Sequence, residues 1–183
     1  MRTFKFMRYG AFSDDTVSAE ELKAWSAQFG FPLPDRYVAF MAQTNGGSIY
    51  PSVFEHQHPQ IKPIAAFEDF YDWQSVLEES ELDCPAQERS IAPDHLIIGS
   101  TTVEDQIVLR LHSEAPGAIY LRGHNTSPNW ITDGVDEFGF IAHSFGAFID
   151  SLREPKPGEP VYLKIWDTKG GAAPETSISS VVI

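Results

Sequence analysis

The chain has one cysteine, Cys84, among 183 residues, so no disulfide can form within it. A single free thiol is typical of a protein from a reducing compartment. No apolar run approaches the roughly 20 residues that cross a membrane. Residues 1–12 alternate charged and aromatic side chains, unlike the continuous apolar stretch of a signal peptide. We therefore expect a cytoplasmic protein without a membrane span.

Basic residues are also scarce. The chain has 13 Lys and Arg against 26 Asp and Glu, which gives a net charge of −13. Such a surface repels nucleic acid and anionic lipid, and it favours encounter with a basic protein. An acidic surface also serves solubility alone. We expect a basic protein partner, and neither nucleic acid nor a membrane.

The shortage of basic residues is local as well as global, because no Lys or Arg occurs from Pro63 to Glu88. Acids and aromatics alternate in this stretch, a mixture that suits an interface because aromatics supply anchors and acids supply steering. The alternative is a surface helix whose apolar face is buried. We assign partner binding to eight residues, called the acidic belt: Glu68, Asp69, Asp72, Trp73, Glu78, Glu79, Glu81 and Asp83.

Catalytic patterns are weak. Ala142 to Gly146 resembles a nucleophile elbow around Ser144, but the triad histidine of that fold follows the serine and no histidine occurs after His143. Ser144 is instead placed to cap a helix. The acidic pairs Glu104-Asp105 and Asp136-Glu137, together with Asp133, fit solvated turns better than acid–base sites. No catalytic residue is predicted.

Metal and phosphate sites are equally poorly supported. His56 and His58 alternate on a segment that can present both imidazoles, but a metal site needs further ligands. Glu55, His95 and His124 show no recognised spacing to them. The glycines after Asn45 follow a helix, whereas a phosphate loop precedes one. We predict no metal and no cofactor.

Periodicity predicts several helices. Ser18 to Glu21 forms a capping box, apolar residues then recur at helical spacing, and Gly30 ends this helix. A second helix starts at Pro34-Asp35 and ends at Asn45-Gly46-Gly47. A third is suggested by four apolar positions, and a fourth follows Ser144. The four positions are Phe67, Phe70, Tyr71 and Leu77.

Strands are expected between these helices. Alternation predicts a hairpin of Gln106 to His112 with Ala118 to Arg122. In the first of these strands Ile107, Leu109 and Leu111 face one way, and Val108 and Arg110 face the other. The remaining strands are expected at Thr3 to Tyr9, Ile49 to Phe54 (an edge or bulge, because of Pro51), Ala92 to Gly99 and Val161 to Trp166.

The length of the chain favours one domain, and the order of helix, strands and helix favours an α+β fold. We place this domain at residues 1–168 and a tail, rich in Gly, Ala and Ser, at residues 169–183. The composition of the tail favours partial disorder, while its Val181-Val182-Ile183 ending can pair with a sheet edge.

The chain resembles the SUKH superfamily, which includes a yeast regulator of cell-wall assembly and many bacterial immunity proteins. The resemblance spans roughly Ala19 to Leu152. The segments that show it are Leu33 to Gly47 (LPDRYVAFMAQTNGG), Leu96 to Gly99 with Gln106 to Leu111, Gly117 to His124, and Phe140 to Leu152 (FIAHSFGAFIDSL). A Gly-Asp turn, frequent in the family, is reduced here to Asp105.

The resemblance implies an α+β fold whose central sheet is mixed, mostly antiparallel and flanked by helices. It also implies a non-enzymatic protein-binding domain. Within the superfamily this is often an immunity protein that neutralises a toxin, frequently a nuclease, by direct binding. A nuclease must grip a polyanion, so its active surface is basic, and the acidic belt complements it. The alternatives are a regulatory or scaffold protein of the yeast type and an unrecognised enzyme or ligand-binding protein. A further alternative is a homodimer in which exposed edge strands of two copies pair.

Overall fold

The structure is a computed structural model that describes residues 3–8, 16–82, 84, 92, 94–112, 116–123, 138–159 and 177–182. Some residues and ranges singled out from the sequence lie outside the described residues. Among them are His124, Asp83 of the acidic belt, the acidic group at residues 133–137 and the strand expected at Val161 to Trp166.

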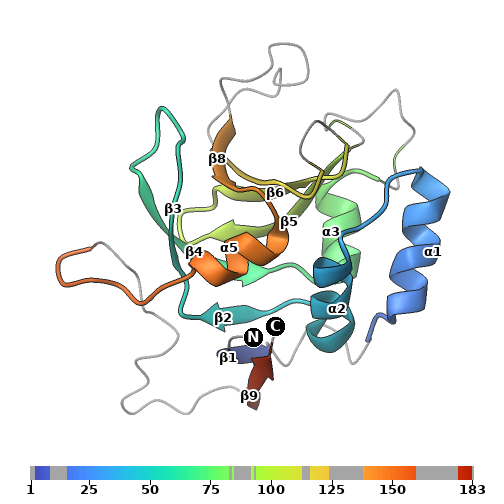
Figure 1. Cartoon of the computed structure of the whole chain (residues 1–183), viewed down its shortest axis with the longest axis horizontal. Helices are drawn as coiled ribbons and strands as arrows, with labels where there is room; N and C mark the ends of the chain where they lie inside the picture. The colour runs from blue at the N-terminus through green and yellow to red at the C-terminus, as the bar shows by residue number, and fades with distance from the viewer. Residues whose placement is uncertain are drawn as a thin grey trace.

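The centre of the fold is a six-stranded antiparallel sheet (Figure 1). Its strands follow the order β3-β4-β5-β6-β7-β8, so neighbours in sequence are neighbours in space. The strands are β3 (Val53–Glu55), β4 (Ile64–Phe70), β5 (His95–Thr101), β6 (Gln106–Arg110), β7 (Ile119–Arg122) and β8 (Phe138–Ala142). The predicted hairpin is confirmed as β6 and β7, in which Val108 faces Tyr120.

A second sheet joins the two ends of the described chain. It has the order β2-β1-β9 and consists of β1 (Thr3–Arg8), β2 (Ser48–Tyr50) and β9 (Ser177–Val182). Strand β9 runs antiparallel to β1 over its whole length. The prediction that the end of the tail pairs with a sheet edge is therefore confirmed.

Four helices are described: α1 (Ala19–Phe29), α2 (Asp35–Thr44), α3 (Trp73–Glu79) and α5 (Phe145–Ser151). The capping box at Ser18 and Glu21 is present, and Gly30 ends α1 in the left-handed conformation. The Ser144 hydroxyl accepts the Ala147 N–H at 3.1 Å and so caps α5. These helix ends form where the sequence predicts them.

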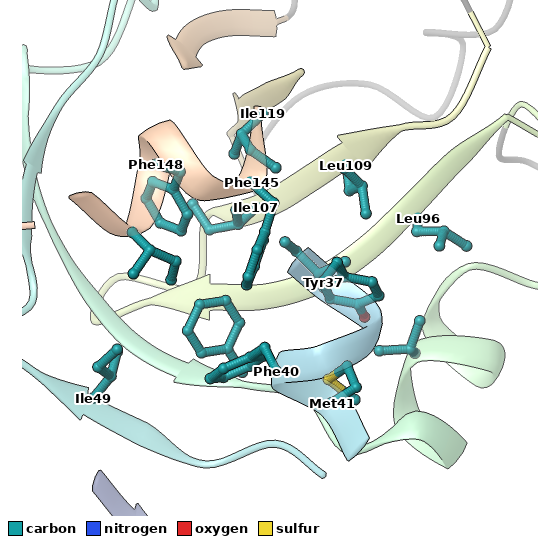
Figure 2. Close-up of a cluster of buried hydrophobic side chains, with 14 of the residues drawn as sticks. Tyr37, Phe40, Met41, Ile49, Leu96, Ile107, Leu109, Ile119, Phe145 and Phe148 are labelled. Carbon is teal, nitrogen blue, oxygen red and sulfur yellow. The ribbon is translucent and has the colours of Figure 1, made fainter. Parts of the chain in front are cut away.

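The core lies between the sheet and the helices α2 and α5 (Figure 2). Tyr37 and Phe40 of α2 meet Phe145 of α5, with ring centroids 5.1 and 5.4 Å apart. Phe70 of β4 packs on Phe40 at 4.6 Å. As predicted, Ile107, Leu109 and Leu111 face this core, whereas Val108 belongs to a separate small cluster on the opposite side of the sheet.

The predicted helix around Phe67, Phe70 and Tyr71 is wrong, because this stretch forms β4 and the helix begins only at Trp73. A bulge between Phe67 and Asp69 shifts the register of β4 against β5. The extra residue puts Phe67 and Phe70 on the core side although they are three apart. A bulged strand thus shows the spacing that is otherwise typical of a helix.

The single strand expected at Ile49 to Phe54 is also corrected. The chain forms β2 and β3, which belong to different sheets and lie on either side of Pro51. Strand β2 pairs with β1, and Val53 of β3 exchanges two backbone hydrogen bonds with Arg153. Both strands are outermost in their sheets, so the predicted edge position is confirmed, and the backbone of Arg153 covers part of β3. Strand β8 was not expected from the sequence.

The connection between β3 and β4 reaches the other end of the six-stranded sheet. The N–H of Gln57 donates to the carbonyl of Phe140 in β8 at 2.9 Å. Gly139 lies so close to the backbone of His58 that a Cβ there would collide with it. Both outer strands of the sheet are therefore covered by backbone from elsewhere in the chain. In the described parts, no helix is long and apolar enough to span a membrane.

Candidate protein-binding surface

The turn after α2 fixes the segment that carries the acidic belt. Gly47 and Phe70 exchange two backbone hydrogen bonds of 2.8 and 3.0 Å, which bind the turn to the end of β4. A Cβ on Gly46 would lie 2.5 Å from the Asp72 nitrogen, so only glycine permits this approach. Asn45 accepts the Trp73 N–H at 3.0 Å and so holds the start of α3. The Asn45-Gly46-Gly47 turn is thus a structural support for the belt.

Two belt residues lie on β4. Glu68 is exposed, whereas Asp69 is half-buried and its carboxylate accepts the Ser100 hydroxyl at 3.1 Å. Burial raises the pKa of Asp69 to about 6; the Ser100 hydrogen bond opposes this rise, and the charge of Glu68 adds to it. Asp69 is therefore poised to change its charge in the mildly acidic range.

Two further belt residues have structural roles. Asp72 caps α3, because its carboxylate accepts the Ser75 N–H at 2.8 Å. Trp73 packs against the core, and its ring meets Trp25 of α1 edge to face, with centroids 4.9 Å apart. These contacts occupy much of both side chains, so they contribute less to a partner surface than the sequence suggested.

The other belt residues lie on α3 and just after it. Glu78 and Glu79 are exposed, and Glu78 accepts a hydrogen bond from Gln74 at 2.8 Å. Glu81 is half-buried in the turn that follows the helix, with a positive φ of 53°. The belt therefore runs over a strand, a turn and a short helix, and it is not one face of a single helix.

Tyr71 is the residue around which the belt acids gather. Burial raises the pKa of its phenol, the Ser100 hydrogen bond opposes this, and the carboxylates of Glu79, Asp69 and Glu68 raise it further. All three carboxylates thus lie near one half-buried aromatic ring. We call these four residues the Tyr71 cluster. Phe67 and Phe70, in contrast, are only 2% exposed and cannot act as surface anchors.

The face of the six-stranded sheet that points away from α2 and α5 is here called the outer face, and Tyr71 lies beside it. Tyr71 packs there against Ile97 and Val108, and so does Phe138 of β8. Arg110, Tyr120 and Arg122 also project from this face. Sequence reasoning missed it as a candidate surface, although the alternation of β6 already placed Val108 and Arg110 on the side opposite the core.

The alternative sites have structural explanations. Ser144 is engaged as a helix cap. The Nδ1 atoms of His56 and His58 accept the backbone N–H groups of His58 and Gln60, both at 3.1 Å. In the part of the chain that the structure describes, no three His, Cys, Asp or Glu side chains are grouped to hold a metal ion.

The sequence of the chain is similar to one family of known proteins. No curated protein sequence matches the chain. The model of one protein family does match, over residues 16–151, which include every described helix and strand from α1 to α5. The chain therefore belongs to the SMI1 / KNR4 family (SUKH-1).

Proposed function

We propose that this protein is a non-enzymatic protein-binding domain that neutralises a toxin by direct contact. Its partner is a basic protein domain, and a nuclease is the class that fits best. The observation that carries the proposal is the Tyr71 cluster, in which a half-buried tyrosine experiences the charges of three carboxylates, those of Glu79, Asp69 and Glu68. An aromatic anchor within a charged rim is a common composition of a binding surface.

Electrostatics supports this partner class. The chain carries a net charge of −13, and no basic residue occurs between Pro63 and Glu88 to offset the belt. A nuclease surface that binds phosphates is rich in Lys and Arg, so the two potentials are complementary. Long-range attraction mainly raises the association rate, whereas affinity depends on buried contacts such as those that Tyr71 offers. We place the encounter in the cytoplasm.

The runner-up is a regulatory or scaffold protein that binds a partner without neutralising a toxin. Membership of the SMI1 / KNR4 family supports it, since the family includes regulatory as well as immunity domains. The two functions differ in their biological outcome, because only an immunity protein restores growth to cells that express a toxin.

The test is co-purification with the product of the gene encoded next to this one, followed by growth rescue and binding kinetics at two salt concentrations. We expect a 1:1 complex whose association slows as salt rises, because screening weakens steering. The double reversal Glu68→Lys with Glu79→Lys should slow association roughly tenfold.

The matched control is the double reversal Glu20→Lys with Glu154→Lys, which changes the net charge equally at two exposed acids, one in α1 and one after α5. It should leave the association rate nearly unchanged. Equal effects of the two sets of reversals would show that net charge acts and that the Tyr71 cluster does not. Binding without growth rescue would favour the regulatory function.

A further inference from the structure

The outer face carries a cation, Arg110, that forms no ion pair with any residue that the structure describes. The Arg110 guanidinium carbon lies 5.5 Å from the centroid of the Tyr120 ring, a cation–π distance. Its Nε is buried and has no hydrogen-bond partner. Among the described residues, no carboxylate lies within ion-pair distance of Arg110. An unmet buried donor on a cation is costly, so the free chain does not satisfy this side chain.

A second cation lies close by on the neighbouring strand. Arg122 of β7 donates to the side-chain carbonyl of Gln106 at 2.7 Å. Burial lowers the pKa of His95, the carboxylate of Asp94 opposes this, and Arg110 and Arg122 lower it further. Both guanidinium groups thus lie near the His95 ring. The chain has twice as many acidic as basic residues, so two arginines on one face of the sheet form a local region of positive charge.

Aromatic rings surround the two cations. Phe138 stacks on His95 with centroids 5.4 Å apart and meets Tyr120 edge to face at 6.2 Å. Phe138 and Tyr120 are each partly exposed. Between them and the Tyr71 cluster lie Ile97 and Val108, which are almost completely buried beneath Tyr71 and Phe138. The outer face therefore runs from an acidic end, over an apolar middle, to a cationic end.

We propose that the cationic end of the outer face docks a segment of a partner protein that presents one carboxylate to Arg110 and apolar side chains to Tyr120 and Phe138. The proposal rests on the proposed function in one respect, namely that the chain is a protein-binding domain. Charge complementarity identifies the occupant. A carboxylate would supply a counter-charge to the Arg110 guanidinium, which forms no ion pair among the described residues, and such charge-assisted bonds are among the stronger polar contacts.

The acidic end of the same face limits what can bind. Nucleic acid or an anionic membrane would bring many negative charges against Glu68, Asp69 and Glu79, which repel them. A partner segment with a single acidic residue avoids this repulsion. Because the two ends have opposite signs, a partner that is basic elsewhere would be held in one orientation.

The test is an NMR titration of the labelled full chain with the peptide acetyl-Leu-Glu-Leu-amide. The matched probe is acetyl-Leu-Gln-Leu-amide, which differs only in its charge. We expect the Glu peptide to shift the Arg110 side-chain Nε–H and the backbone amides of β6 and β7, with millimolar affinity because a short peptide buries little area. The Gln peptide should bind roughly tenfold more weakly.

Arg110→Gln should weaken binding of the Glu peptide by the same factor, whereas Lys23→Gln, which removes an exposed charge from α1, should not. Shifts of equal size with the two peptides, or no shifts in β6 and β7, would overturn the proposal. The wild-type titration decides the matter even if Arg110→Gln fails to fold. No basic partner is used, so this proposal and the proposed function succeed or fail separately.

Discussion

The side-chain oxygen of Asn45 accepts the backbone N–H of Trp73 at 3.0 Å, which ties the end of α2 to the start of α3. The two residues are 28 positions apart in sequence. Asn45 also holds a left-handed conformation with φ 45°. One side chain thus ends a helix and positions the segment that carries the acidic belt.

Asn45→Ala should destabilise the fold by about 2 kcal/mol, because it removes a hydrogen bond and places alanine in a left-handed conformation. Asn45→Gly removes the same hydrogen bond but tolerates that conformation, so it should cost about 1 kcal/mol. Chemical denaturation of the three proteins measures both free energies of unfolding. Equal losses for the two variants would show that backbone conformation contributes nothing at this position.

Gly46 and Gly158 provide a matched pair, since both have φ 86°. A Cβ on Gly46 would lie 2.5 Å from the nitrogen of Asp72, whereas a Cβ on Gly158 would meet nothing within 4 Å. Gly158→Ala should therefore lower the free energy of unfolding by only about 1 kcal/mol, because alanine is less stable than glycine in the left-handed conformation.

Gly46→Ala should lower the free energy of unfolding by at least about 3 kcal/mol, because the backbone of Tyr71 and Asp72 must also move away from the new Cβ. It should also shift the amide resonances of Tyr71 and Asp72. Similar melting temperatures for the two variants would contradict the close contact between the turn and the β4–α3 segment.

Asp69 should make stability depend on pH. Its folded pKa of about 6 lies above its ordinary value of 3.8, so between these values the folded state binds more protons than the unfolded state. The free energy of unfolding should therefore fall as pH rises from about 4 to 6, by on the order of 2 kcal/mol.

Asp69→Asn keeps an acceptor for Ser100 but cannot ionise, so its profile should be flatter over this range. The measurement is urea denaturation at several pH values. A profile for Asp69→Asn that matches the wild type would mean that Asp69 does not titrate there.

Ser144 should act through its hydrogen bond to the Ala147 N–H. Ser144→Ala should cost about 1 kcal/mol of stability, while Ser144→Asp, which can also cap a helix, should be close to the wild type. Thermal denaturation compares the three proteins. If Ser144→Asp were as unstable as Ser144→Ala, a role other than capping would have to be sought for this hydroxyl.

Local patterns in the sequence predicted much of the fold. Ser18 and Glu21 mark the start of α1, and Gly30 and Asn45 mark helix ends, because capping depends on residues within one turn. Alternation predicted β6 and β7 and their inward-facing residues, since side chains along a strand point to opposite faces. Family membership could also be predicted from these segments.

The candidate site was predicted only in part. Glu68, Glu78 and Glu79 are exposed as expected, but Asp72 and Trp73 are engaged in capping and packing. The helix expected around Phe67 is wrong because a bulge in β4 gives its apolar residues the spacing of a helix, so the hydrophobic pattern alone does not distinguish the two structures.

The sequence by itself determined several helix ends, the β6–β7 hairpin and the strongly acidic charge of the chain, because these depend on residues close together in sequence or on composition. Only the tertiary structure decided which charges become neighbours. Glu79 approaches Tyr71 because α3 folds back beside β5, where the Ser80 hydroxyl accepts the Ile97 N–H at 2.8 Å. Arg110 and Arg122 both act on His95 because β5, β6 and β7 lie side by side in the sheet. Contacts of this kind depend on strand order and register, which residues distant in sequence set together.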